Sequence, residues 1–417
     1  MKIEFPVLII GLGKSGNSAL RLLKGLYPNS EIKTYDAKDP SADFSQTSAA
    51  LSYNPKTLVV SPGVPLSSSW IQNLVSSGAQ LESELSLAFN FLKQESVIAI
   101  TGSMGKSTTT SLLGAAVHAL SSANFVGGNL GFPLADYVYS VLFQNQPRAD
   151  WVVLELSSYQ LENFKNLISS ASLLTALSHN HLERYPNLDT YYQTKWNLKD
   201  KTKGPFFLNY DNPEIVRWCS AKLDSKTKKI NSLDFQDHPM KMVGLHNREN
   251  LSLALAVAQY FSWPPAALSA IENYPGLSHR LEFVNDSRGV RKINDSKATT
   301  IESVLAAVNS CLPDVKAGGR LHLLVGGRDK NLPWTSLNQL KNHQNLQCYF
   351  FGECGDLAKS QSELSGLSFT QLKLAAEAAL AASQSGDVIL LSPGGSSMDE
   401  FTNFEARGDF FKSLCCD

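Results

Sequence analysis

The chain has 417 residues, of which 43% are hydrophobic and 18% are charged. This composition is typical of globular domains and excludes a disordered chain, a collagen-like chain or a coiled coil. Lysine and arginine total 37 and aspartate and glutamate total 38, so the net charge of −1 offers no basic field for nucleic acid or an anionic membrane. At about 150 residues per domain, the length predicts roughly three domains.

Cysteine usage and hydropathy indicate the compartment. The six cysteines include no Cys-x-x-Cys pair, which favours reduced thiols in a cytosol over a disulfide framework. The apolar run Val7–Ile10 is too short for a signal-peptide core or a membrane span, and no apolar stretch approaches the length of about 18 residues that a span needs. We therefore expect a cytoplasmic protein with no membrane insertion.

Short apolar runs alternate with longer helical patterns, which predicts parallel sheets with crossover helices. The predicted strands include Val7–Ile10, Leu58–Ser61, Val97–Thr101, Trp151–Leu156, Leu321–Val325 and Val388–Ser392. Ligands of such folds bind at the carboxyl ends of the strands. We expect an α/β protein with three domains, at residues 1–92, 93–277 and 278–417.

The first glycine-rich turn follows Val7–Ile10 and reads Gly11-Leu-Gly-Lys-Ser-Gly16. With Asp36 after the next strand-like run, the spacing matches the dinucleotide-binding fingerprint. It predicts binding of a pyrophosphate, in NAD or in a UDP-linked molecule; the alternative is a tight turn that needs glycine for steric reasons alone. Ser61-Pro-Gly63 ends a neighbouring strand and either lines the same crevice or forms a routine turn.

The second glycine-rich turn reads Thr101-Gly-Ser-Met-Gly-Lys-Ser-Thr108 and precedes a helix that runs to about Leu120. Its backbone N–H groups and the helix dipole favour a phosphate. Lys106 adds a cation for the β- and γ-phosphates, and Ser107 adds a hydroxyl for Mg²⁺. Two residues separate its glycines where the strict pattern has four, so we interpret it as a P-loop variant.

Glu155 lies near the end of the apolar strand Trp151–Leu156. A buried carboxylate needs a partner, and Mg²⁺ held at the P-loop would be one; the alternative is a capping or ion-paired glutamate. On spacing alone His181 is a surface histidine, with metal ligand and general base as alternatives. On the same basis Lys195, on a helical stretch, is a solvated lysine.

These motifs together resemble those of the Mur ligases, which add amino acids to the UDP-linked precursor of peptidoglycan. The matching segments are Thr101–Thr108, Gly127–Asn129, Glu155–Gln160, His181–Pro186, Gly244–Asn247, His279–Arg280, Asn294–Lys297 and Gly326–Lys330. The first glycine-rich turn and the segment Ser392–Gly408 are further similar to the members that add D-glutamate. The resemblance spans nearly the whole chain in order.

The resemblance implies a Rossmann-like UDP-binding domain, a central P-loop ATPase domain with a parallel sheet, and a Rossmann-like C-terminal domain for the amino acid. It implies ATP and two Mg²⁺ ions as cofactors, and UDP-N-acetylmuramoyl-L-alanine and D-glutamate as substrates. The substrate carboxylate takes the γ-phosphoryl group of ATP, and the amine of D-glutamate then attacks this acyl phosphate. We expect a monomer that binds no nucleic acid.

The resemblance also implies residue roles. The ATP site comprises Gly102, Ser103, Gly105, Lys106, Ser107, Thr108, Asn250, Arg280 and Asp295. The site for the UDP substrate comprises Lys14, Ser15, Asp36, Ser61, Gly63, Asn129, Ser157, Gln160 and His181. The D-glutamate site comprises Thr299, Lys330, Ser397 and Phe404. The metal ligands are Ser107, Glu155, His181 and a carbamylated Lys195, and the catalytic residues are Lys106, Glu155, His181, Lys195 and Lys297.

Four residues depart from the usual pattern of the family, namely Ser86, Met104, Ala176 and Asn180. Asn180 stands where an aspartate is usual and removes a charge beside the second metal. Another ligase of the superfamily, such as a folylpolyglutamate synthase, would share the P-loop but would not need the first glycine-rich turn. An NAD-dependent oxidoreductase would leave the P-loop and Glu155 unexplained, and a non-catalytic nucleotide-binding regulator would not need the catalytic residues.

Overall fold

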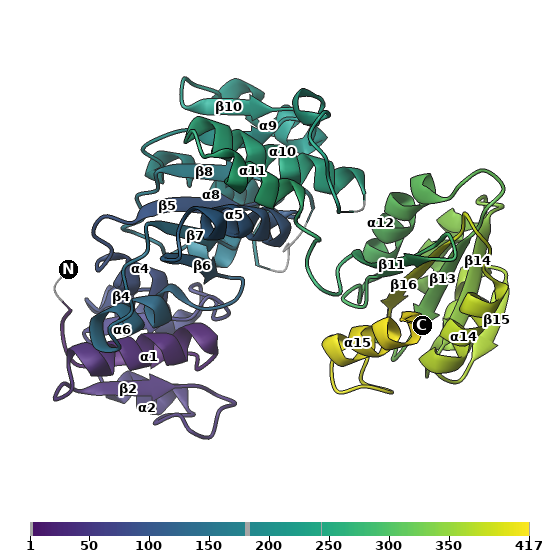
Figure 1. The fold of residues 1–417 in the computed structure, drawn as a ribbon. Helices are drawn as coiled ribbons and strands as arrows, with labels where there is room; N and C mark the ends of the chain where they lie inside the picture. The colour runs from purple at the N-terminus through teal and green to yellow at the C-terminus, as the bar shows by residue number, and fades with distance from the viewer. Residues whose placement is uncertain (1–2, 180–183, 243, 417) are drawn as a thin grey trace. The chain divides into compact units, whose positions relative to one another are not determined.

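The computed structural model describes residues 3–179, 184–242 and 244–416, and three sheets lie within them (Figure 1). The chain divides into two compact units. Unit 1 combines Met1–His238 with Glu249–Glu272 and contains the first two sheets, and unit 2 combines Pro239–Arg248 with Asn273–Asp417 and contains the third.

The first sheet is parallel, with strand order β2-β1-β3-β4. Its elements are β1 (Val7–Ile10), α1 (Lys14–Leu26), β2 (Ile32–Tyr35), α2 (Thr47–Ser52), β3 (Thr57–Val60), α3 (Ser69–Ser76), β4 (Gln80–Glu82) and α4 (Glu84–Phe89). Val7 and Ile9 pack on the face that α1 and α4 cover, and Leu8 and Ile10 pack on the opposite face with α2 and α3. The strand order reverses beside β1, and ligands of such sheets bind at the carboxyl ends of the strands next to such a reversal.

The second sheet is also parallel, with strand order β10-β9-β8-β5-β7-β6. Its strands are β5 (Ser96–Thr101), β6 (Asn124–Gly128), β7 (Trp151–Glu155), β8 (Ala171–Leu174), β9 (Phe206–Asn209) and β10 (Thr227–Ile230). The α-helices that accompany it are α5 (Lys106–Leu120), α6 (Leu134–Phe143), α7 (Ser158–Leu161), α8 (Leu188–Trp196), α9 (Pro213–Cys219), α10 (Leu245–Tyr260) and α11 (Pro265–Glu272). Short 3₁₀ turns are η1 (Lys199–Lys201), η2 (Ser220–Lys222) and η3 (Ser232–Phe235). The fully buried strands β8 and β9 are apolar throughout or nearly so, as expected of a parallel sheet covered on both faces.

The third sheet has strand order β11-β12-β16-β13-β14-β15. Its strands are β11 (Glu282–Ser287), β12 (Val290–Asn294), β13 (Leu321–Gly326), β14 (Leu346–Phe351), β15 (Gly366–Phe369) and β16 (Val388–Gly394). Its helices are α12 (Ile301–Cys311), η4 (Leu312–Asp314), η5 (Trp334–Leu340), α13 (Gly355–Ser362), α14 (Leu372–Ala382) and α15 (Phe404–Cys415). All neighbouring pairs are parallel except β11 and β12, which form an antiparallel hairpin.

The sequence-based strands are present, with ends that differ by one or two residues. The antiparallel strand β11 was not predicted; Arg288 and Gly289 at its turn have φ values of 57° and 71°, as a tight two-residue hairpin requires. One sheet falls within each predicted domain range, 1–92, 93–277 and 278–417, and the boundaries themselves stay predictions.

No disulfide joins the six cysteines, which all lie in the described part of the chain, and five of them are buried. Within the described part of the chain, every helix is too short or too polar to cross a bilayer.

Candidate active site

The first glycine-rich turn joins β1 to α1 and is fastened by its own neighbours. Gly11 has a φ of +87°, which a residue with a side chain rarely adopts. A Cβ on Gly16 would lie 1.9 Å from the carbonyl oxygen of Gly11, so this position excludes any side chain. The hydroxyl of Ser61, at the end of β3, donates to the same carbonyl at 2.7 Å. The turn and the end of β3 therefore form one rigid edge.

Asp36 follows β2 and binds this turn from the other side. Its Oδ2 accepts the N–H of Leu12 at 2.8 Å, and its Oδ1 accepts that of Lys38 at 2.8 Å. These N–H groups, that of Leu12 first, hold the pKa of Asp36 below its ordinary value. Asp36, which is predicted to line the UDP site, thus also holds the first glycine-rich turn in place.

The other predicted residues of this edge are more open. Lys14 is exposed at the first position of α1, and Ser15 is partly exposed. A Cβ on Gly63 would meet no atom within 4 Å, so packing does not require glycine there. Lys14, Ser15, Ser61 and Gly63 all lie near the carboxyl ends of β1 and β3, on adjacent strands.

The second glycine-rich turn joins the central strand β5 to α5, and both of its glycines are required. Gly102 has a φ of +152°, and a Cβ there would lie 2.1 Å from Oγ1 of Thr175. Gly105 has a φ of +80°, and a Cβ there would lie 2.4 Å from Oδ1 of Asn250. The N–H of Ser103 donates to the carbonyl of Ala176 at 2.7 Å. The conformation of the loop is therefore fixed by contacts with α10 and with the residues that directly follow β8.

Two lysine side chains converge on one carbonyl of this loop. Lys106 and Lys195 each donate from Nζ to the oxygen of Gly102 at 2.9 Å. Lys195 is only 1% exposed, so the prediction of a solvated lysine, which rested on spacing alone, is wrong. Burial, reinforced by the charge of Lys106, lowers the pKa of Lys195 well below its ordinary value against the opposing effect of Glu155. The α8 face that carries Lys195 is directed inward, a fact that spacing could not reveal.

Glu155 ends β7 beside β5, where its backbone pairs with Ile100. It is 1% exposed, and its Oε1 accepts Nδ2 of Asn129 at 2.7 Å. Its Oε2 is buried and has no hydrogen-bond partner among the described residues. An unpartnered oxygen on a buried carboxylate is costly, and a hard cation removes that cost. Glu155 therefore fits a Mg²⁺ ligand, with Ser107 at the start of α5 as the hydroxyl donor.

Ser157 and Gln160 form reciprocal hydrogen bonds at the start of α7. The Ser157 hydroxyl accepts the N–H of Gln160 at 3.2 Å, and the Gln160 side chain accepts the N–H of Ser157 at 2.9 Å. This capping box fixes both side chains next to the end of β7. His181, predicted as a metal and substrate ligand, and Asn180 lie outside the described residues.

Asn250 and Thr108 complete the set of ATP-site predictions in unit 1. Asn250, on α10, is 4% exposed, and its Oδ1 accepts the hydroxyl of Thr109 at 3.2 Å. Thr108 is buried in the first turn of α5. Met104, one of the departures from the family pattern, is 61% exposed at the tip of the loop. Ser86, another departure, is buried, and its Oγ accepts the N–H of Lys165 at 3.1 Å.

Tyr191 and Thr175 belong to this site but were not predicted. The hydroxyl of Tyr191 donates to Oγ of Ser103 at 3.1 Å, and the Lys195 ammonium lies 4.6 Å from the centre of the Tyr191 ring. Thr175 donates from Oγ1 to the carbonyl of Met104. Tyr191 precedes Lys195 by four residues, so the helical spacing was a usable signal for it. Thr175 comes close through sheet pairing and left no local signal.

In unit 2, Asp295 follows β12 and is 6% exposed. Its Oδ2 accepts the hydroxyl of Ser392 at 2.9 Å, and its Oδ1 accepts the N–H of Leu281 at 3.2 Å. Burial raises the pKa of Asp295 to about 7 despite these hydrogen bonds and the charge of Arg280. Arg280 itself is partly exposed and follows His279, which has a φ of +62°.

Lys297 and Phe404 lie together in unit 2, with the Lys297 ammonium 5.1 Å from the centre of the Phe404 ring. Thr299, Lys330 and Ser397 lie beyond the carboxyl ends of β12, β13 and β16, which are neighbours in the sheet. Ser397 is buried, whereas Lys330 is exposed. The predicted D-glutamate residues therefore share one edge of this sheet.

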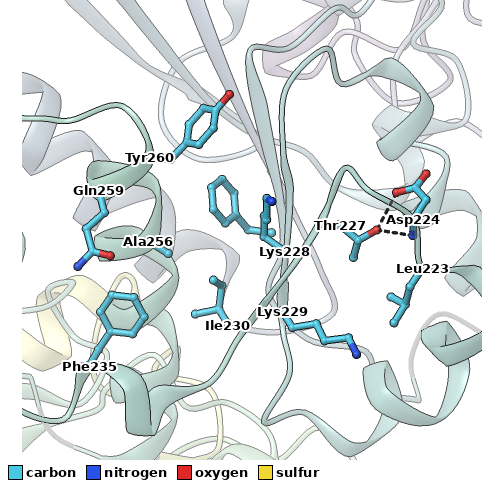
Figure 2. A pocket seen from close by; sticks show the side chains of 11 residues that line it. Leu223, Asp224, Thr227, Lys228, Lys229, Ile230, Phe235, Ala256, Gln259 and Tyr260 are labelled. Carbon is cyan, nitrogen blue, oxygen red and sulfur yellow. Dashed lines mark hydrogen bonds between the residues drawn. The ribbon is translucent and has the colours of Figure 1, made fainter.

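A separate hollow of about 810 Å³ lies beside the edge strand β10 (Figure 2). Its apolar lining includes Phe207, Ile230 and Tyr260, and Lys228 lies among them. None of the residues predicted to bind ATP, the UDP substrate, D-glutamate or metal lines this hollow, so we do not assign it to the active site.

Comparison with known proteins identifies the family by sequence. The family model of the Mur ligase middle domain matches residues 100–238. The UDP-N-acetylmuramoylalanine--D-glutamate ligase of Pasteurella multocida is 32% identical to this chain over an alignment 442 residues long, gaps included. The alignment covers 98% of this chain and 97% of that protein. The ligase of the same name from Vibrio parahaemolyticus is 33% identical over 441 residues, with the same coverage.

Solved structures agree at the level of the fold. The UDP-N-acetylmuramate-alanine ligase of Thermotoga maritima has a TM-score of 0.58 at 15% identity and covers 99% of both chains. The bifunctional folylpolyglutamate synthase/dihydrofolate synthase of Yersinia pestis has a TM-score of 0.55 at 16% identity and covers 85% of this chain. Such low identities show a common fold alone, whereas the sequence relatives exceed 30% identity over almost their full length. The chain therefore belongs to the Mur ligase family, among its UDP-N-acetylmuramoylalanine--D-glutamate ligases.

Proposed function

We propose that the protein is an ATP-dependent ligase that joins D-glutamate to UDP-N-acetylmuramoyl-L-alanine, in the cytoplasmic synthesis of peptidoglycan precursors. The relatives from Pasteurella and Vibrio are named for this activity, and their similarity to this protein extends over nearly the whole chain. The structural observation that carries the proposal is the buried Glu155 at the end of β7, next to the P-loop strand β5, with one oxygen unpartnered among the described residues.

The P-loop residues bind and orient ATP in this proposal. Backbone N–H groups at the start of α5 point toward the phosphates, and the helix dipole favours their charge. Without a ligand, Nζ of Lys106 donates to the carbonyl oxygens of Gly102 and Ser103 at 2.9 and 3.2 Å. When ATP binds, the same ammonium group donates to phosphate oxygens instead. Asn250 supports the loop from α10, and Arg280, Asp295 and Lys297 are the further residues that this proposal assigns to the nucleotide.

Glu155 and Ser107 would hold Mg²⁺, and His181 with a carbamylated Lys195 would hold a second ion. Cations held there would neutralise the phosphate charge that otherwise repels the attacking carboxylate. Two ammonium groups on one carbonyl repel each other, which favours the neutral amine at the buried Lys195. The lone pair of this amine attacks the carbon of CO₂, and one proton leaves to solvent. The carbamate supplies oxygen, the ligand type that Mg²⁺ prefers.

The UDP end of the substrate lies on the first glycine-rich turn, with Lys14, Ser15 and Asp36, and along Ser61 and Gly63. The muramoyl-alanine end lies along Asn129, Ser157, Gln160 and His181. A carboxylate oxygen of the alanine attacks the γ-phosphorus, and ADP leaves. The amine of D-glutamate, held by Thr299, Lys330, Ser397 and Phe404, then attacks the acyl carbon, loses a proton, and phosphate leaves.

The experiment is an ADP-release assay in which each substrate is omitted in turn. ADP release should require both UDP-N-acetylmuramoyl-L-alanine and D-glutamate, with L-glutamate a poor replacement. Equal turnover with L-lysine or diaminopimelate would contradict the amino-acid assignment. Turnover of a reduced folate with L-glutamate, and none of the UDP substrate, would instead support a folylpolyglutamate synthase. Size-exclusion chromatography with light scattering measures the molar mass in solution and so tests the expectation that the protein is a monomer.

A further inference from the structure

Arg184 makes an unusual set of contacts within unit 1, between segments that are far apart in sequence. Its Nη1 donates to the carbonyl of Pro62 at 3.2 Å, and its Nη2 donates to that of Val64 at 3.4 Å. Its Nε and Nη2 also donate to the two carboxylate oxygens of Glu162, at 3.1 and 2.6 Å. The guanidinium carbon lies 4.4 Å from the centre of the Tyr159 ring.

The contacts on one side fix the turn after β3. Pro62 directly follows Ser61, whose hydroxyl binds the carbonyl of Gly11 at 2.7 Å. The N–H of Val64 closes the same turn on the carbonyl of Ser61 at 3.0 Å. Arg184 therefore binds the turn that is itself attached to the first glycine-rich turn, where the UDP end of the substrate is proposed to lie.

The contacts on the other side fix α7. Tyr159 lies within this helix, next to Gln160 of the capping box, and Glu162 ends it. The Tyr159 ring stacks on Tyr185 at 6.2 Å, and Tyr185 packs against Tyr191 at 5.3 Å. Tyr191 is the ring that lies beneath the Lys195 ammonium. A continuous row of rings thus joins Arg184 to the proposed metal-binding lysine.

We infer that Arg184 is a positioning residue that sets the span between the UDP-binding turn and the reacting carboxylate. This inference rests on the proposed function. A single planar guanidinium reaches two carbonyls and both oxygens of one carboxylate, whereas a lysine ammonium presents all its donors from one atom. Arg184 and Glu162 are 11% and 18% exposed, so solvent does not replace these contacts easily. A substrate bound at both ends senses any change of this span, since a displacement of about 1 Å can cost roughly 10²-fold in rate.

The test compares Arg184→Lys with Arg148→Lys as a matched control. Arg148 also pairs with a glutamate, Glu95 at 2.8 Å, and also donates to a carbonyl, that of Phe91 at 3.0 Å. It precedes β7 and therefore lies at the opposite end of the strand from Glu155. Both variants keep the charge and lose the planar fork. Melting temperature, the KM values for ATP and for UDP-N-acetylmuramoyl-L-alanine, and calorimetric affinity for UDP alone are measured for each.

For Arg184→Lys we expect the KM of UDP-N-acetylmuramoyl-L-alanine to rise about tenfold, while the KM of ATP and the affinity for UDP alone stay within about twofold. Arg148→Lys should leave all three within about twofold. Glu162→Gln, which keeps one acceptor oxygen, should raise the KM of the UDP substrate by about threefold and serves if Arg184→Lys does not fold.

An unchanged KM for the UDP substrate in Arg184→Lys, or equal changes for ATP and the UDP substrate, would overturn the inference. If Arg184→Lys does not fold, an unchanged KM in Glu162→Gln would do the same. Calorimetry separates this result from the proposed function. If the parent protein binds the UDP substrate but does not couple it to D-glutamate, the proposed ligase activity fails, while the calorimetric affinities of the parent and of Arg184→Lys for the UDP substrate itself still test Arg184. If the parent does not bind the UDP substrate, both fail.

Discussion

The two glycine-rich turns share a strand–turn–helix plan but differ in how their polar groups are satisfied. In the first turn, the carboxylate of Asp36 accepts the N–H of Leu12, and Ser61 donates to the carbonyl of Gly11. Each partner comes from a neighbouring strand end of the same small sheet. These two hydrogen bonds hold the first turn in place without any ligand.

The second turn brings several charged groups close together. Lys106 and Lys195 share the carbonyl of Gly102, and Glu155 keeps one buried oxygen without a partner among the described residues. Buried ionisable groups that lie this close together cluster where chemistry occurs. The comparison teaches that changes at the first turn should act on substrate binding and stability, and changes at the second on turnover.

The largest effect should follow from the loss of Lys195. We expect Lys195→Ala to lose activity by roughly 10³-fold, because a proposed metal ligand worth several kcal/mol is removed. Added formate or acetate should restore part of the activity in this variant by occupying the vacated position. Lys195→Arg should not respond, since its guanidinium keeps its charge and fills the space. Steady-state rates with and without the small carboxylate provide the measurement, and near-normal activity of Lys195→Ala would remove this residue from the site.

Glu155→Gln should have the next largest effect. Glutamine keeps an acceptor for Asn129 but loses the negative charge, so we expect kcat to fall by about 10²-fold and the Mg²⁺ requirement to rise. A Mg²⁺ titration of the rate measures both quantities. The thermal stability of the apoprotein should not fall, because the oxygen that accepts from Asn129 is kept and the oxygen that is replaced has no hydrogen-bond partner among the described residues. A variant with the Mg²⁺ dependence of the parent would show that Glu155 holds no metal.

Gly16→Ala should sharpen the comparison at the first turn. A Cβ there would overlap the carbonyl of Gly11, so we expect a loss of about 2 kcal/mol in the free energy of unfolding and a higher KM for the UDP substrate. The value of kcat should change little, because the second turn is untouched. Gly63→Ala is the matched control and should be neutral, since its Cβ would meet nothing within 4 Å. Urea unfolding and steady-state kinetics of the two variants test the pair.

The smallest effects concern stability against pH. Lys195 has a lowered pKa in the folded protein, so the unfolded chain binds more protons between this lowered pKa and the ordinary lysine pKa. This lysine therefore destabilises the fold at every pH below the ordinary lysine pKa. Lys195→Met should therefore raise the melting temperature at neutral pH in CO₂-depleted buffer. Asp36 has a lowered pKa, and its contribution is present above its ordinary value and lost as the pH falls through the folded value. Asp36→Asn should lower the melting temperature at neutral pH but not at strongly acidic pH; shifts of the same sign would break the comparison.

Much of the fold follows from short-range patterns. The buried strands β1, β5 and β7 are continuous apolar runs, and the glycine spacings mark the turns after β1 and β5, because sterics at these positions leave few other residues. The hairpin strand β11 was missed because its burial is partial and its residues are mostly polar, so its pairing with β12 has no apolar signature.

The sequence by itself determined the α/β class, the two glycine-rich turns and the likeness to the Mur ligases, since each depends on residues that are close in the chain. Only the tertiary structure decided that Lys195 is buried against Gly102, that Glu155 keeps an unpartnered oxygen, and that Arg184 joins the turn after β3 to α7. These facts depend on which helix face meets the sheet and on which strands are neighbours. Both are set by packing between segments tens of residues apart, which no local pattern encodes.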